Sequence, residues 1–122
     1  MSTRMLAALV MTFIATAAMA HSTLKSTVPP SDSVLSASPP EVVINFNEPA
    51  RLVSVIVARA GAPERKLQFT PVAESTTFNV AAPALENGRN EIKWRALSKD
   101  GHPISGTIVI VVKPAAATPK SP

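Results

Sequence analysis

Short stretches of alternating apolar and polar residues, separated by turn residues, fill most of the chain after residue 20. The clearest runs from Asn90 to Leu97, where Ile92, Trp94 and Ala96 alternate with charged residues. A period of two predicts a strand with one buried face. Six further segments are typical of strands, and they cover residues 21–28, 41–47, 52–59, 66–69, 76–80 and 104–113.

Proline-containing segments are expected to separate these strands. Glu48-Pro49 should end the strand over 41–47, because proline cannot donate a hydrogen bond to a neighbouring strand. The next strand is expected to place Val53, Val55 and Val57 on one side. Earlier in the chain, residues 29–33 predict a turn.

No segment after residue 20 shows the 3.6-residue apolar stripe of an amphipathic helix. Seven short strands with turn residues every 8–12 positions are typical of an immunoglobulin-like β-sandwich. The fold class predicted from the residues is therefore all-β. A small closed barrel is the alternative.

The N-terminus has the features of a secretory signal peptide. Arg4 precedes an apolar run, Met5 to Ala20, that ends in Ala-Met-Ala. This run is shorter than the ~18 apolar residues that a membrane-spanning helix needs. We expect residues 1–20 to be cleaved during export, so that His21 begins the mature chain. The mature chain should then contain a β-domain over 21–114 and a disordered tail over 115–122, which is rich in Ala and Pro.

Composition excludes some functions. The chain has no cysteine, so the thiolate ligands that zinc and copper(I) favour are absent. Its twelve Lys and Arg residues are scattered and are not interleaved with aromatic residues, which argues against nucleic-acid binding. After residue 20 no segment is long and apolar enough to span a membrane, and we expect a monomer.

The first candidate metal ligand is His21, one of only two histidines in the chain. At a mature N-terminus it would offer both an α-amine and an imidazole. These two nitrogens can chelate one metal ion in a six-membered ring. Copper(II), which favours tetragonal nitrogen and oxygen donors, suits such a pair.

The second candidate is the segment Asp100-Gly101-His102-Pro103. If the segment is extended, the side chains of Asp100 and His102 point to the same face. Gly101 would let the backbone approach closely, and Pro103 would stiffen the exit. Together with His21, the segment would complete a set of three nitrogens and one oxygen. A plain surface turn is the alternative interpretation.

The mature chain resembles the CopC-type periplasmic copper-resistance proteins. The resemblance rests on His21 after an Ala-x-Ala site and on four segments. These are Thr27-Val28-Pro29, Val43 to Pro49, Ile92 to Arg95 and Ser98 to Gly106, of which the last is the most specific.

The resemblance implies a seven-stranded Greek-key sandwich or barrel of the immunoglobulin-like or cupredoxin-like kind. It also implies a copper(II) site formed by His21, Asp100 and His102, with Glu48 as a partner of the amine or a weak ligand. Such a protein would be a periplasmic chaperone or scavenger and not an enzyme. It would pass copper to a membrane importer or to another periplasmic copper protein.

Two departures from the family pattern matter. All four methionines, Met1, Met5, Met11 and Met19, lie in the predicted signal, so no copper(I) thioether site is expected. Thr23 stands where some members carry a further histidine.

Two other functions compete with this interpretation. A copper oxidase with an N-terminal histidine chelate would need an exposed, often aromatic, substrate face, but the chain has no tyrosine and its one tryptophan alternates inward. A metal-free immunoglobulin-like interaction module is the other alternative.

Overall fold

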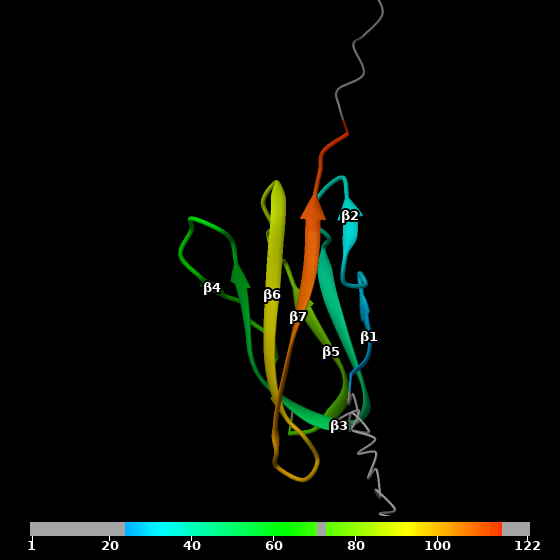
Figure 1. The fold of residues 1–122 in the computed structure, drawn as a ribbon. Coiled ribbons are helices and arrows are strands. Elements are labelled where there is room, and N and C mark those ends of the chain that lie inside the picture. Colours follow the sequence, from blue (N-terminus) through cyan, green and yellow to red (C-terminus); the bar gives the residue numbers. More distant parts are fainter. Residues whose placement is uncertain (1–23, 71–72, 116–122) are drawn as a thin grey trace, which may run out of the picture.

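The computed structural model describes residues 24–70 and 73–115. This part of the chain is all-β and contains seven strands, as predicted (Figure 1). The predicted signal peptide, His21 and residues 116–122 of the predicted tail lie outside it. The strands are β1 (Leu24–Val28), β2 (Ser33–Leu35), β3 (Glu41–Ala58), β4 (Arg65–Lys66), β5 (Ser75–Ala81), β6 (Gly88–Leu97) and β7 (Pro103–Val112).

The strands form two sheets that share β3. In the first sheet, the N-terminal half of β3 lies between β1 and β5, and all pairs are antiparallel. In the second sheet, the C-terminal half of β3 lies between β4 and β6, and β7 follows β6. β2 completes this sheet by pairing with β7 in parallel. The two sheets therefore form a sandwich connected by one continuous strand.

The prediction that Glu48-Pro49 ends a strand was wrong. β3 is a single strand of 18 residues that passes through this dipeptide. Its pairing with β5 is irregular between Asn45 and Ala50, so the proline lies where no regular ladder bond is required of it. After Ala50 the strand pairs with β6 instead. The proline marks a change of partner, which residue pattern alone does not distinguish from an end.

A bulge in β3 changes the predicted burial of one valine. The register with β6 shifts between Leu52 and Ser54. As a result Val53 is 49% exposed, whereas Leu52 and Val55 are buried. An extra residue in a strand reverses the alternation at that point, so the prediction that Val53 and Val55 face the same side was wrong.

Two short strands also differ from the predictions. The segment predicted over 66–69 pairs only at Arg65–Lys66, although Leu67 still donates its N–H to the Val55 carbonyl at 2.8 Å. β2 was not predicted, because three residues next to a proline-rich turn carry too little alternation to reveal a strand. With β3 counted once, the total is again seven.

The core lies between the two sheets and contains the residues that the alternation placed inward. Ile92, Trp94 and Ala96 of β6 are buried, as predicted, and so are Phe78 and Val80 of β5. The remaining buried hydrophobic residues are Val42, Ile44, Phe46, Ala50, Leu52, Val55, Val57, Leu67, Leu85, Ile108, Ile110 and Val112.

Three aromatic rings connect the sheets within this core. The ring of Phe46 makes edge-to-face contacts with Phe78, at 5.9 Å between centroids, and with Trp94, at 5.3 Å. Such pairs add about 0.5–1.5 kcal/mol beyond the area they bury. Phe46 therefore joins its own sheet to β6 of the other.

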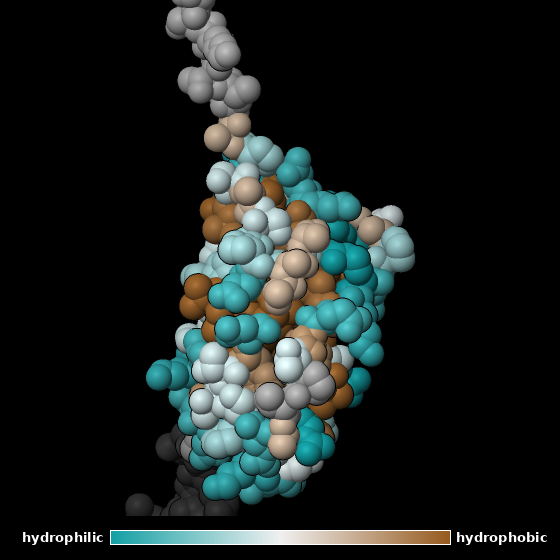
Figure 2. All heavy atoms as spheres, turned by 180° about the vertical axis from the view of Figure 1, so that it is seen from behind, coloured by the Kyte–Doolittle hydropathy of each residue, from teal (hydrophilic) through white to brown (hydrophobic). Residues whose placement is uncertain are grey.

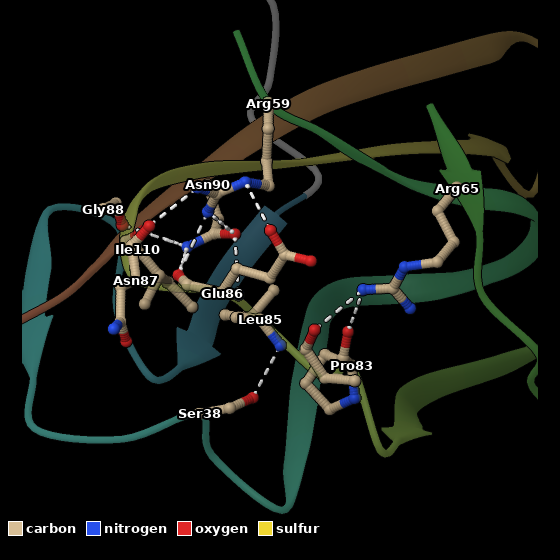
Figure 3. A network of polar contacts seen from close by, with 11 residues as sticks. Ser38, Arg59, Arg65, Pro83, Leu85, Glu86, Asn87, Gly88, Asn90 and Ile110 are labelled. Atoms are coloured by element: carbon tan, nitrogen blue, oxygen red, sulfur yellow. Dashed lines mark hydrogen bonds and ion pairs between the residues drawn. The ribbon is translucent and has the colours of Figure 1, made fainter. Parts of the chain in front are cut away.

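A buried polar network closes the end of the sandwich at which β6 begins (Figure 3). Asn90 is fully buried, and its amide nitrogen donates to the carbonyls of Glu86, Gly88 and Ile110 at 2.8–3.3 Å. Its amide oxygen accepts from the Arg59 guanidinium at 2.9 Å. Buried polar groups are costly unless bonded, and this network satisfies Asn90 fully.

The surface carries few large apolar side chains. In the described residues the exposed large hydrophobic side chains are Val28, Val34 and Val53. Seen from behind in Figure 2, hydrophobic residues are interspersed with hydrophilic ones. No helix in the described ranges is long and apolar enough to cross a membrane.

Replacing Gly106 with alanine is expected to destabilise the protein. Gly106 lies opposite Trp94, and an added Cβ would be 2.5 Å from the indole Cζ2 atom. We expect Gly106→Ala to lower the free energy of unfolding by about 1–3 kcal/mol, as overpacking does in other cores. Urea denaturation followed by Trp94 fluorescence measures this change. The neighbouring Ser105→Ala, on the exposed side of β7, should change stability by at most ~0.5 kcal/mol. Equal stability of the two variants would contradict the prediction.

Candidate metal centre

Asp100 and His102 lie in the hairpin loop that joins β6 to β7. Three hydrogen bonds to Ser98 shape this loop. The Gly101 N–H donates to the Ser98 carbonyl and the Ser98 N–H donates to the His102 carbonyl, both at 2.8 Å. The His102 N–H donates to the Ser98 hydroxyl at 3.1 Å. With Gly101 at φ 80°, the loop is a tight hairpin with a glycine bulge.

The extended geometry from which a shared face was predicted is absent. Lys99 and Asp100 form a turn, and Gly101 adopts a left-handed backbone conformation. Gly101 has a role that the residue pattern did not predict. No atom beyond its chain neighbours lies within 4 Å of a Cβ built there, so within the described residues the need for glycine comes from its positive φ.

The candidate ligands in the described part of the chain are open to solvent. Asp100 and His102 are both exposed, and so is Glu48 in the middle of β3. Across residues 24–70 and 73–115, no group of three or more His, Cys, Asp or Glu side chains is placed to hold a metal ion. The structure thus brings Asp100 and His102 into one loop but does not add Glu48 to them as a metal-binding group. His21 lies outside the described residues.

Strand register places the start of β1 and this loop at the same end of the sandwich. Leu24 lies opposite Phe46 in the first sheet. β3 then continues to Arg51, which lies opposite Leu97, and Leu97 lies opposite Pro103. Figure 1 shows the beginning of β1, the bend of β3 and the β6–β7 loop at this one end. His21 stands three positions before Leu24 in the sequence.

Ser98 is the residue of this loop that sequence reasoning missed. It was named only as part of a segment that carries the family resemblance, with no role of its own, although it makes all three of the hydrogen bonds that shape the hairpin. A serine before a turn that contains glycine is a weak signal. Serine hydroxyls often bond backbone groups a few residues away, but the sequence does not show which group is bonded.

One surface hollow lies elsewhere, beside the C-terminal end of β3 and the first half of β6. It has a volume of about 380 Å³ and includes Arg59, Glu64, Glu91 and Lys93 in its lining. Lys93 pairs with Glu64 there at 3.7 Å. Asp100 and His102, which are exposed, are not part of its lining.

Comparison with known proteins identifies the family. Residues 24–113 match the family model described as the CopC domain. The chain belongs to the CopC family. The matched range begins with the first residue of β1 and ends directly after β7, so it contains every strand of the sandwich.

Other CopC proteins resemble this chain in sequence and structure. It is 31% identical over 116 residues to copper resistance protein C of Escherichia coli, with 82% of this chain and 87% of that protein covered. The crystal structure of CopC from Methylosinus trichosporium OB3b superposes with a TM-score of 0.63 at 24% identity, covering 80% of this chain and 99% of that one.

A third relative is PcoC, a methionine-rich copper resistance protein from Escherichia coli. Its crystal structure superposes with a TM-score of 0.56 at 28% identity and covers 77% of this chain and 100% of that one. These matches confirm the predicted family and the predicted Greek-key β-sandwich class.

The positive φ of Gly101 predicts a specific effect of substitution. Gly101→Ala should destabilise the domain by about 1 kcal/mol, because a Cβ is unfavourable in the left-handed region. Gly101→Asn should be milder, since asparagine tolerates this conformation. Thermal unfolding resolves the difference, as 1 kcal/mol shifts the midpoint by roughly 4–8 °C in a domain of this size. A midpoint for Gly101→Ala equal to that of the wild type would show that the loop does not need this conformation.

Proposed function

We propose that this CopC protein is a periplasmic copper(II)-binding protein that captures one ion at the end of the sandwich carrying the β6–β7 loop. The ligands are the α-amine and imidazole of His21, the carboxylate of Asp100 and the imidazole of His102. The observation that carries the proposal is the exposed Asp100–His102 hairpin at the same end as the beginning of β1. Two relatives are named as copper resistance proteins, which supports copper as the metal.

The donor types fit copper(II). Imidazole, amine and carboxylate donors suit its tetragonal preference, and copper(II) leads the affinity order of divalent first-row metals. Glu48 lies in the stretch of β3 between Phe46 and Arg51, which pair with Leu24 and Leu97 at this end of the sandwich. It can serve as a hydrogen-bond acceptor for the amine of His21, in the way that outer carboxylates orient metal ligands elsewhere.

The protein works by capture and release and needs no catalytic step. Exposed ligands on a hairpin leave room for a partner to approach the ion directly. We infer that the protein passes copper to a membrane importer or to another periplasmic copper protein. The relative PcoC is described as methionine-rich, whereas all four methionines of this chain lie within residues 1–20. Once those residues are removed, no thioether remains for copper(I).

The oxidase alternative receives no support from the aromatic residues. Trp94, Phe46 and Phe78 are buried in the core and Phe69 is partly buried against it, so they form no exposed aromatic platform for a polysaccharide. The proposed Asp100 ligand would also occupy a position that oxygen chemistry requires to be open. Peroxide-dependent oxidation of a glycan by the copper-loaded protein would favour the oxidase alternative instead.

Blocking the N-terminal amine is expected to weaken copper binding severely. A mature chain that begins at His21 should bind one copper(II) ion, whereas a chain with one additional alanine before His21 loses the free amine of the chelate. We expect affinity to fall at least about 100-fold, which corresponds to a loss of ~2.8 kcal/mol. Competition calorimetry against a copper chelator measures the affinity, and electron paramagnetic resonance reports the number of nitrogen ligands. Equal affinity of the two chains would exclude His21 as a chelating ligand.

Substitutions in the hairpin test the other two ligands. Asp100→Asn and His102→Ala should each reduce copper(II) affinity by at least 10-fold. Asp32→Asn is the matched control, because Asp32 is also an exposed aspartate in a turn but lies between β1 and β2. If Asp32→Asn weakens binding as much as Asp100→Asn, the effect is one of net charge and Asp100 is not a ligand.

Copper(II) binding should weaken on acidification, since the amine and imidazoles must lose protons to bind the metal.

A further inference from the structure

Ser98 is bonded to both polar backbone groups of His102. Its N–H donates to the His102 carbonyl at 2.8 Å, and its hydroxyl accepts the His102 N–H at 3.1 Å. Its carbonyl is already used, because it accepts the Gly101 N–H at 2.8 Å. All three hydrogen-bonding groups of this one residue therefore bond within the loop that carries Asp100 and His102.

The glycine bulge explains why the hydroxyl is needed. In a regular antiparallel pair, the Ser98 carbonyl would accept the N–H of the residue opposite, His102. Because the bulge adds one residue, the Ser98 carbonyl accepts the Gly101 N–H instead. The His102 N–H therefore lacks the acceptor that a regular ladder would give it. The side chain of Ser98 replaces the lost acceptor. Alanine at position 98 would leave this N–H to water.

We propose that Ser98 is a positioning residue of the copper(II) site, which holds the backbone of His102 in place relative to Asp100. This inference rests on the proposed function. His102 is exposed, so core packing does not fix it, and the bonds to Ser98 supply that restraint. On its other side, Pro103 begins β7 and has a fixed φ. His102 is thus held from both sides.

The proposal predicts that Ser98→Ala lowers the affinity for copper(II) but changes the thermal stability of the protein little. The loop is exposed, so water can replace the lost hydroxyl and Ser98→Ala should unfold within a few degrees of the wild type. Copper(II) affinity should nevertheless fall about 10-fold, the lower end of the range seen when a group that orients a metal ligand is removed. Ser98→Thr keeps the hydroxyl and should restore the affinity.

The control is another serine with the same kind of bond far from the loop. The hydroxyl of Ser31 accepts the Val109 N–H at 2.9 Å, and Val109 lies well inside β7. Ser31→Ala therefore removes an equivalent hydrogen bond without touching the hairpin. It should leave copper(II) affinity unchanged.

The experiment uses mature chains that begin at His21, with three measurements on the wild type, Ser98→Ala, Ser98→Thr and Ser31→Ala. Competition titration with copper(II) gives the affinity, and electron paramagnetic resonance shows whether the copper environment becomes heterogeneous. Amide hydrogen exchange at His102 in the metal-free protein reports the restraint itself. We expect weaker binding, a mixed spectrum and at least 10-fold faster exchange for Ser98→Ala alone.

The possible failures are distinguishable. If the wild type binds copper(II) and Ser98→Ala binds it equally well, Ser98 has no positioning role and the proposed function stands. If Ser31→Ala weakens binding as much as Ser98→Ala, the effect is general and the positioning role is overturned. If the wild type binds no copper(II), the proposed function fails and this inference fails with it, even where His102 exchange responds as expected.

Discussion

The continuity of β3 is the constraint on which the rest of the structure depends. One strand of 18 residues belongs first to the sheet with β1 and β5 and then to the sheet with β6. Its buried side chains run through both halves, and Ala50 and Leu52 are buried where the partner changes. The register of this one strand therefore fixes Leu24 opposite Phe46 and Leu97 opposite Arg51. The relative position of the beginning of β1 and the β6–β7 loop follows from a single hydrogen-bonded segment.

The aromatic contacts across the core keep the two halves of β3 in that relation. Phe46 comes from the first half, and Trp94 from the strand that pairs with the second. The indole ring packs directly over Gly106, where no side chain could fit. Its Nε1 atom is buried and finds no acceptor among the described residues. An unpaired buried donor costs about 1–3 kcal/mol, so the apolar area that the large ring buries must offset this cost.

Features that depend on local alternation, such as the buried face of a strand, were predicted correctly from the sequence. Features that depend on which strands pair, such as the length of β3, were not. The inward faces of β5, β6 and β7 were predicted correctly, because buried residues alternate with less buried ones from Phe78 in β5, from Asn90 in β6 and from Ile108 in β7. The continuation of β3 through Pro49 was not predictable, because it depends on which strand lies alongside. The exposure of Val53 likewise comes from a bulge in the register with β6.

In the candidate metal centre, too, some features were predicted from the sequence and others were not. Asp100 and His102 stood out because histidine is scarce in the chain, and both proved to be exposed in one loop. The shape of that loop was not predicted, since a bulge at Gly101 and a hydroxyl bond from Ser98 follow from the geometry of the closed hairpin. The residues Asp100 to Pro103 fit an extended segment and a turn equally well, so their identity alone did not distinguish the two. His21 and the cleavage after Ala20 remain predictions.

The two ends of the sandwich use polar groups in opposite ways. Where β6 begins, Asn90 is fully buried, and Arg59 donates to the carbonyls of Glu86 and Asn87 as well as to Asn90. Every one of these bonds serves the fold, and none leaves a donor set free for a ligand. Where β6 ends, the hairpin satisfies its backbone through Ser98, and the side chains of Asp100 and His102 make no hydrogen bond or ion pair to another described residue. Under the proposed function this separation is useful, because an ion could then enter and leave the loop without disturbing the core.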